Sequence, residues 1–201
     1  MSESKDGDVL VFFKLKGQTK AIRAESTSEI DPEDDHATDF TPGYYFSTDN
    51  FSFQINLADD EGQNVFNQDE DRSYGRWRSL KTDEAPKPPF MADPDDINLT
   101  RMIDASSPVL LQHCLEAKPF ADAVLIKRAR VSDKSMLQTI LRFEFKDVYI
   151  KAVEWEDDDA VKETIKFKFN AVTARYFSQG PGGDLVPAGE FKWVSKAAKA
   201  Q

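Results

Sequence analysis

Hydrophobic and polar residues alternate with a period of two along several stretches of the chain. In residues 51–57, aromatic and aliphatic side chains alternate with Ser, Gln and Asn. Successive side chains of a strand point to opposite faces of a sheet, so this pattern predicts a strand with one buried face. Similar patterns, or short dense apolar runs, predict seven further strands, at residues 9–15, 97–103, 121–130, 137–145, 148–155, 161–177 and 186–194.

The longest of these segments, residues 161–177, changes phase along its length. Its apolar residues lie at odd positions up to Phe169 and at even positions from Val172 onward. A shift of one residue moves the apolar set to the opposite face unless a bulge absorbs it. We therefore expect a bulge near Asn170 and Ala171. We also expect Phe167 to lie in the core, with its two lysine neighbours facing the other way.

One short helix is predicted after the strand at residues 97–103. Ser107 is a suitable N-cap, and Pro108 suits the first helical position because proline lacks the N–H group that would be unpaired there. Pro119 ends the helix by restricting the residue before it. An apolar stripe at helical spacing is formed by Leu110, Leu111, Cys114 and Leu115.

About eight strands and one helix predict a mainly β fold, either a barrel or a sandwich. The length of 201 residues suits a single domain covering the whole chain. Residues 59–94 are polar and charged, contain three closely spaced prolines and lack regularly spaced apolar positions. This segment is expected to be a long loop insertion.

Charge and composition exclude several classes of function. The formal net charge of −10 argues against general nucleic-acid or anionic-membrane binding, which needs clustered Lys and Arg. The apolar runs are too short to span a bilayer, and no apolar segment follows a basic start at the N-terminus, so we expect neither membrane insertion nor a general secretory signal peptide. The single cysteine, Cys114, allows no internal disulfide framework.

Acidic residues gather in two segments that could be considered as metal sites. Residues 25–39 contain Glu33, Asp34, Asp35, His36 and Asp39, but they lack the spacing and central glycine of a calcium loop. Zinc sites usually recruit more His or Cys. A solvated acidic loop is the favoured interpretation. Residues 156–159 are similarly expected to form a hairpin turn.

No catalytic motif stands out. His113 and Cys114 are adjacent on the predicted helix, so their side chains diverge by about 100°. The 36 acidic residues make chance pairing of carboxylates common, so no acid–base pair is selected. The sequence has no glycine-rich phosphate loop and no nucleophile elbow. We therefore expect no catalysis, no cofactor and no structural metal.

Cations and aromatic residues are interleaved within the insertion, in Arg72, Tyr74, Arg76, Trp77 and Arg78. Stacking on nucleic acid is one interpretation of this pattern, but the acidity of the chain argues against it. A protein contact is favoured because Arg, Tyr and Trp are common interface anchors. A plain surface loop remains open as an alternative.

Several of these segments resemble the haemolysin-coregulated protein (Hcp) family, the tube proteins of bacterial type VI secretion systems. The most specific element is an Ile-Asp-x-x-Ser-Pro-x-Leu block, matched here by residues 103–110. Residues 22–27 resemble the family's Ile-Lys-Gly-Glu-Ser-Thr segment, with Ala24 in place of its glycine. Residues 51–53 resemble its aromatic-Ser-aromatic strand, and residues 120–130 and 161–176 resemble two later strands. Trp193 stands where the family has a Gly-Trp pair.

The resemblance implies a single β-barrel with one flanking helix, assembling as a ring. Six copies would form the ring, and rings would stack into a tube inside a contractile sheath. The tube would be expelled with a spike protein and with effectors, some of which family members hold in the lumen. The protein would reside in the bacterial cytoplasm before firing and leave the cell without a signal peptide. A monomeric ligand-binding barrel is the alternative function.

Overall fold

The structure is a computed structural model, and it describes residues 7–26, 28–58, 91–94, 96–131, 134–157, 160–180 and 184–195. The chain divides into two compact units. The larger unit consists of Met1–Ser52 and Asn98–Gln201, and the smaller unit is Phe53–Ile97.

The elements form a nine-stranded sheet, a separate two-stranded antiparallel sheet and one helix among the described residues. The strands of the nine-stranded sheet are β1 (Gly7–Leu15), β2 (Phe46–Thr48), β3 (Asn50–Ser52), β6 (Ile97–Met102), β7 (Phe120–Arg130), β8 (Leu137–Asp157), β9 (Val161–Lys168), β10 (Ala171–Gln179) and β11 (Leu185–Val194). The two-stranded sheet consists of β4 (Ile55–Ala58) and β5 (Met91–Pro94), and the helix is α2 (Ser107–Leu115).

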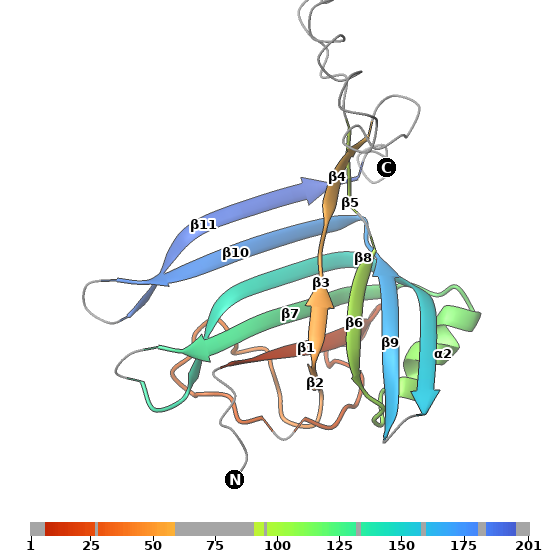
Figure 1. Cartoon of the computed structure of the whole chain (residues 1–201), viewed down its shortest axis with the longest axis horizontal. Helices are drawn as coiled ribbons and strands as arrows, with labels where there is room; N and C mark the ends of the chain where they lie inside the picture. Colours follow the sequence, from red (N-terminus) through yellow and green to blue (C-terminus); the bar gives the residue numbers. More distant parts are fainter. Residues whose placement is uncertain are drawn as a thin grey trace, which may run out of the picture. The chain divides into compact units, whose positions relative to one another are not determined.

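Strand β8 is 21 residues long and belongs to two parts of the sheet. Its first part pairs with β7 and β10, and its second part pairs with β9. Between the two parts Asp147 has a φ of 49°, which is uncommon for a residue other than glycine and turns the strand. Figure 1 shows the result, with β6 and β9 running across the direction of β7, β10 and β11. The strands expected at residues 137–145 and 148–155 are therefore one bent strand.

The phase change in residues 161–177 is confirmed, but it is a break and not a bulge. β9 ends at Lys168 and β10 begins at Ala171, and the two strands pair with different parts of β8. Between them the N–H of Asn170 donates to the carbonyl of Lys146 at 2.9 Å. A second register shift falls between Tyr176 and Phe177, where Tyr176 is 52% exposed and Phe177 is buried.

The main sheet follows the strand order β2-β1-β7-β8-β9-β6-β3, with β10 and β11 extending from β8. Its terminal strands β2 and β3 are separated only by Asp49, whose N–H donates to the carbonyl of Thr100 at 2.8 Å. The expected mainly β fold with one helix is confirmed. The sheet is not closed by strand pairing, so a closed barrel is not confirmed.

Aromatic residues form the core on one face of the sheet. The ring of Phe13 lies 5.2 Å from that of Phe120 and 5.6 Å from that of Phe167, and Phe145 is 5.3 Å from Phe167. Phe167 is fully buried, as predicted, and Lys168 is exposed. Such edge and tilted contacts stabilise the core beyond the area that they bury.

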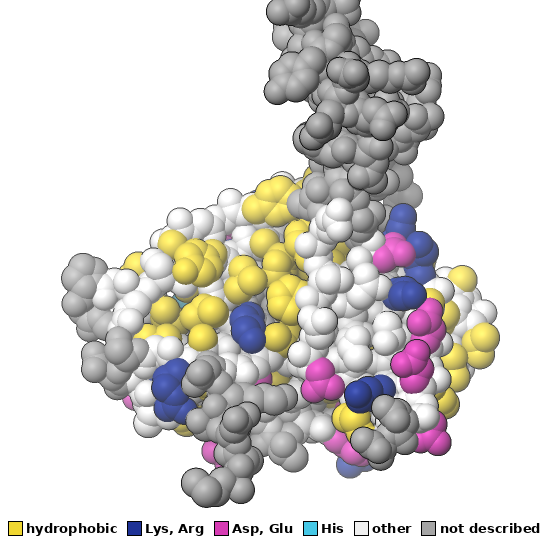
Figure 2. All heavy atoms as spheres, in the orientation of Figure 1, with side chains coloured by type: hydrophobic (Ala, Val, Ile, Leu, Met, Phe, Trp, Pro, Cys, Tyr) yellow, Lys and Arg dark blue, Asp and Glu magenta, His cyan; other side chains and the backbone are white. Residues whose placement is uncertain are grey.

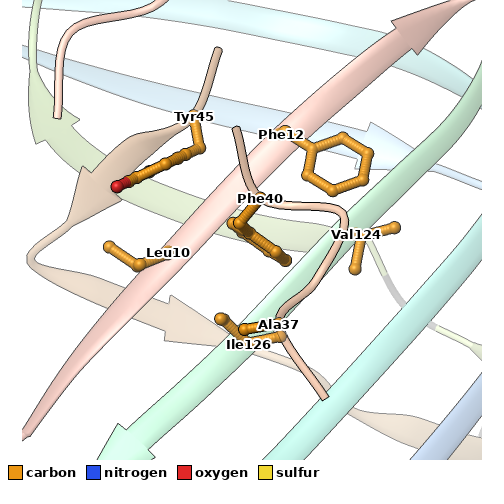
Figure 3. Packing of buried hydrophobic residues seen from close by; sticks show 7 residues of the cluster. All are labelled: Leu10, Phe12, Ala37, Phe40, Tyr45, Val124 and Ile126. Atoms are coloured by element: carbon orange, nitrogen blue, oxygen red, sulfur yellow. The ribbon is translucent and has the colours of Figure 1, made fainter. Parts of the chain in front are cut away.

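The opposite face of the sheet is covered by residues 25–45, which we call the covering segment. Figure 3 shows Ala37, Phe40 and Tyr45 of this segment packed against Leu10 and Phe12 of β1 and two residues of β7. Within residues 25–39, which were expected to form an exposed acidic loop, Asp31, Asp34 and Ala37 are buried, whereas the other acidic residues are exposed. The expectation is therefore wrong only for these three positions.

Two carboxylates of the covering segment are buried and fasten it to β8. Asp34 accepts hydrogen bonds from the N–H of Thr139 at 2.9 Å and from its hydroxyl at 2.7 Å. Asp31 accepts one from the side-chain amide of Gln138 at 2.6 Å. Buried carboxylates need such partners because burial removes their hydration.

The helix differs from its prediction at both ends. Ser106 occupies the N-cap position, and Ser107 is already helical. The helix ends at Leu115, before Pro119, and Ala117 adopts a φ of 50° beyond it. Leu110 is buried as expected, but Leu115 is 79% exposed, so the predicted apolar stripe is only partly covered.

The segment expected to be a loop at residues 59–94 ends in a strand. Met91–Pro94 forms β5 and pairs antiparallel with β4, from Ile55 opposite Pro94 to Ala58 opposite Met91. Residues 59–90 lie outside the described part of the chain.

Candidate assembly surfaces

The sequence block that resembles the Hcp family most specifically builds a buried ion network. Arg101, from β6, is 1% exposed and lies with its guanidinium 3.8 Å from the centre of the Phe46 ring. Its Nε donates to Glu163 of β9 at 2.8 Å, and its Nη2 donates to the hydroxyls of Ser106 and Ser107 at 2.8 and 3.0 Å. The network thus joins β6, β9 and the start of α2.

Glu163 is the acceptor at the centre of this network. It is fully buried, and besides Arg101 it accepts hydrogen bonds from the Ser107 hydroxyl at 3.1 Å and from the indole N–H of Trp155 at 2.8 Å. A buried charge that is paired and hydrogen-bonded on all sides is tolerated, whereas an unpaired one is costly. The Ser107 side chain therefore binds Arg101 and Glu163 and does not cap the helix.

Asp104 completes the network on the side of residues 22–26. Its Oδ1 lies 2.8 Å from Nη1 of Arg101, and its Oδ2 accepts a hydrogen bond from the N–H of Glu25 at 2.9 Å. Burial by itself would raise the pKa of Asp104, but the Arg101 charge and hydrogen bonds from Ser106 and Glu25 outweigh it and lower the pKa below its usual value.

Large apolar side chains are exposed at several places on the larger unit. One group, which we call the β10–β11 patch, consists of Tyr176, Val186 and Phe191. The pairing of β10 with β11 places these three residues on the same face of the sheet. Figure 2 shows hydrophobic side chains gathered over β10 and β11. Further exposed apolar side chains are scattered over β6, the turn after it, α2, the second part of β8 and the end of β11, at Met102, Ile103, Leu115, Tyr149, Trp155 and Val194. The register of β8 and β9 places Tyr149 and Trp155 on opposite faces of the sheet, so these residues do not form one surface.

These exposed side chains were not singled out by the sequence. An exposed apolar residue in a strand has the same pattern as a buried one, and only the pairing partners distinguish the two. The predicted contact residues Arg72, Tyr74, Arg76, Trp77 and Arg78 lie outside the described residues.

Other predicted sites are placed as follows. The His36 ring stacks on Phe177 with 3.7 Å between ring centres, and Asp39 pairs with Arg142 at 2.6 Å. His113 stacks on Phe120 at 4.2 Å between ring centres. Within the described ranges, no three His, Cys, Asp or Glu residues are grouped so that they could hold a metal ion. No helix there is long and apolar enough to cross a membrane.

Comparisons with solved structures give the class of the fold. A type six secretion system protein matches with a TM-score of 0.62 and 16% identity, over 94% of this chain and 95% of that chain. Hcp1 from Salmonella typhimurium matches with a TM-score of 0.55 and 17% identity, over 94% and 97%. The secreted protein Hcp3 from Pseudomonas aeruginosa matches with a TM-score of 0.53 and 13% identity, over 94% and 99%. At these identities the likeness establishes the fold, which is that of type VI secretion proteins.

A family model matches part of the sequence. The family model described as "Type VI secretion system effector, Hcp" matches residues 80–176, which include the Arg101 network and most of the central strands. No curated protein matches the chain. Over these residues the chain is similar to the Hcp family, and its fold is that of type VI secretion proteins.

Proposed function

We propose that this protein is the inner-tube subunit of a type VI secretion system, that six copies form a closed barrel-walled ring, and that the rings stack into a tube. Its partners would be further copies of itself, the contractile sheath, the spike protein and secreted effectors held in the lumen. It would wait in the bacterial cytoplasm and be exported by the contraction, without a signal peptide. The observation that carries this proposal is the Hcp fold, which extends over 94% of the chain.

The β10–β11 patch supports a contact between copies. Its three large apolar side chains are exposed on one face of the sheet. If this patch meets a different surface of the next copy, the contact is heterologous, and such a contact closes into a ring when the rotation permits. Burying these side chains between copies removes apolar surface from water, which favours association.

Solution mass tests the ring. Light scattering after size exclusion is expected to give about six copies at micromolar concentration. Phe191→Asp would place a charge in the β10–β11 patch and is expected to shift the mass towards one copy. Thr38→Asp, at an exposed position on the covering segment, is the matched control and should leave the mass unchanged. A monomer at every concentration and at low salt would instead support the alternative, a monomeric ligand-binding barrel.

The insertion at residues 59–94 is proposed as the contact between rings. In the resembled family the corresponding loop reaches from one ring towards the next, and here it carries Trp77 and Arg78 with their neighbouring cations. Shortening residues 63–87 to a brief Gly/Ser linker should leave the ring intact, because the described strands of the nine-stranded sheet all lie outside the deletion. The same change, or Trp77→Ala with Arg78→Ala, should weaken tube growth and export. Normal tubes from the shortened protein would return the insertion to the status of a surface loop.

A further inference from the structure

A pocket of about 240 Å³ lies on the covered face of the sheet, and no residue of the β10–β11 patch lines it. Its floor is formed by β1, β7 and β8. Its walls come from the turn after β1, with Thr19 and Lys20, and from the end of the covering segment, with Thr41 and Tyr44. All of these elements belong to the larger unit.

Strand register places two rows of side chains across the floor. The first row is Lys14 of β1, Asp122 of β7 and Lys146 of β8, which are successive cross-strand partners. Asp122 accepts a hydrogen bond from the Lys146 ammonium at 2.6 Å. The single carboxylate of this row therefore lies between two lysines and is paired with Lys146. Lys14 is left as the one excess positive charge of the row.

The second row is apolar at two of its three positions. It consists of Phe12, Val124 and Glu144, again as successive cross-strand partners. Glu144 is held by Arg142 at 2.8 Å and by Arg175 at 2.7 Å. Its charge is therefore compensated twice, and it does not repel an incoming anion as a free carboxylate would.

Two cations that line the pocket have no carboxylate partner in the part of the chain that the structure describes. These are Lys14 and Lys20, and the Lys20 ammonium rests 5.4 Å from the centre of the Tyr44 ring. The third anionic residue in the lining, Asp39, is bound by Arg142 through both carboxylate oxygens, at 2.8 and 2.6 Å. Every carboxylate of the pocket is thus neutralised internally, and the uncompensated charge is positive.

We propose that this pocket binds a carboxylate group carried on a short apolar body, supplied either by a free dicarboxylic acid or by an acidic side chain of a protein segment. The free lysines would hold the carboxylate by charge-assisted hydrogen bonds. The Thr19 and Thr41 hydroxyls are further donors in the lining, and Phe12 and Val124 would contact the hydrocarbon part. The volume suits a group about the size of one side chain and not a drug-sized ligand.

Calorimetric titration of the full chain tests the proposal, with glutarate, a short Glu-containing peptide and inorganic phosphate as separate probes. Glutarate or the peptide is expected to bind, and added salt should weaken the binding because the contacts are partly exposed. Lys14→Gln and Lys20→Gln should each weaken it by about tenfold or more, as expected for loss of a hydrogen bond to a charged group. Lys16→Gln, an exposed lysine outside the pocket lining, is the matched control and should change nothing.

A variant that is expected to tighten binding distinguishes an effect on the site from general damage to the fold. Asp122→Asn removes the carboxylate that occupies Lys146 and should tighten carboxylate binding several-fold. Tighter binding of the peptide than of glutarate would identify a protein segment as the source of the group, and the reverse would identify a free acid. The proposal is overturned if neither carboxylate probe binds, if only phosphate binds, or if Lys16→Gln matches Lys14→Gln.

Discussion

Replacing Glu163 by Gln should destabilise the protein strongly although the side chain keeps its size. The carboxylate is buried, and it accepts hydrogen bonds from Nε of Arg101 at 2.8 Å and from the indole N–H of Trp155 at 2.8 Å. Glutamine would remove the negative charge and leave the buried guanidinium with Asp104 as its remaining counter-ion. Breaking a buried ion pair on one side costs about 3–5 kcal/mol. Because Asp104 still compensates part of the charge, we expect about 3 kcal/mol.

A matched exposed carboxylate provides the control. Glu154 lies on the same strand as Trp155 and pairs with Lys166 at 2.9 Å, but both side chains of this pair are largely open to solvent. Exposed pairs contribute about 0–1 kcal/mol, so Glu154→Gln should cost less than about 1 kcal/mol. Urea unfolding followed by tryptophan fluorescence measures both variants. The protein concentration must be equal in all samples because assembly would add to the apparent stability.

A double variant tests the cause of the effect. If the loss in Glu163→Gln comes from an uncompensated charge, then adding Arg101→Met should cost much less than it does in the wild-type protein. Additive effects of the two changes would contradict this explanation. Equal losses in Glu163→Gln and Glu154→Gln would refute the conclusion that the buried ion network contributes more to stability than an exposed ion pair.

Three further predictions concern the core, the acid limb of stability and the covering segment. Phe167→Ala should cost about 3–5 kcal/mol of unfolding free energy, whereas Lys168→Ala should cost well under about 1 kcal/mol, and equal losses would show that the register of β9 is wrong. The lowered pKa of Asp104 adds stability that is present above about pH 4 and is lost as the pH falls through the folded-state pKa, so Asp104→Asn should flatten the acid limb of a pH–stability profile; parallel profiles would contradict this. Asp34→Ala should cost about 1–3 kcal/mol by leaving the N–H and hydroxyl that it binds unpaired, while Asp35→Ala, at an exposed position, should be nearly neutral in the same urea assay.

Strand alternation predicted most of the sheet because burial of one face leaves a periodic trace in the sequence. Phe167 and the phase change near Asn170 were placed from this trace alone. The bend of β8 left no comparable trace, because it depends on the backbone of Asp147 and on which strands pair with each part. Pairing over such distances is decided by tertiary contacts, which alternation does not record.

Composition failed for the covering segment for a similar reason. Asp34 and Asp35 are adjacent and chemically identical, yet the first is buried and the second is exposed. The difference is made by Thr139, a partner 105 residues away. The Arg101 network was likewise hidden, because its residues are separated by up to 62 positions and none of them belongs to a catalytic or metal-binding motif. The family resemblance singled out residues 103–110, and the structure shows that Asp104, Ser106 and Ser107 of this block bind the buried Arg101.

The break between β9 and β10 decides which surface is free for assembly. In β9 the odd-numbered side chains are buried, and continuation of that phase would have turned Arg175 towards the core and Tyr176 away from it. Because the phase changes before Ala171, Arg175 instead pairs with Glu144 at 2.7 Å and with Glu190 at 2.8 Å on the covered face of the sheet. Tyr176 is left exposed on the opposite face. The charged side chains of the covered face are therefore paired within one chain, whereas the apolar side chains of the β10–β11 patch are exposed among the described residues. Burying them against another copy would favour the association proposed above.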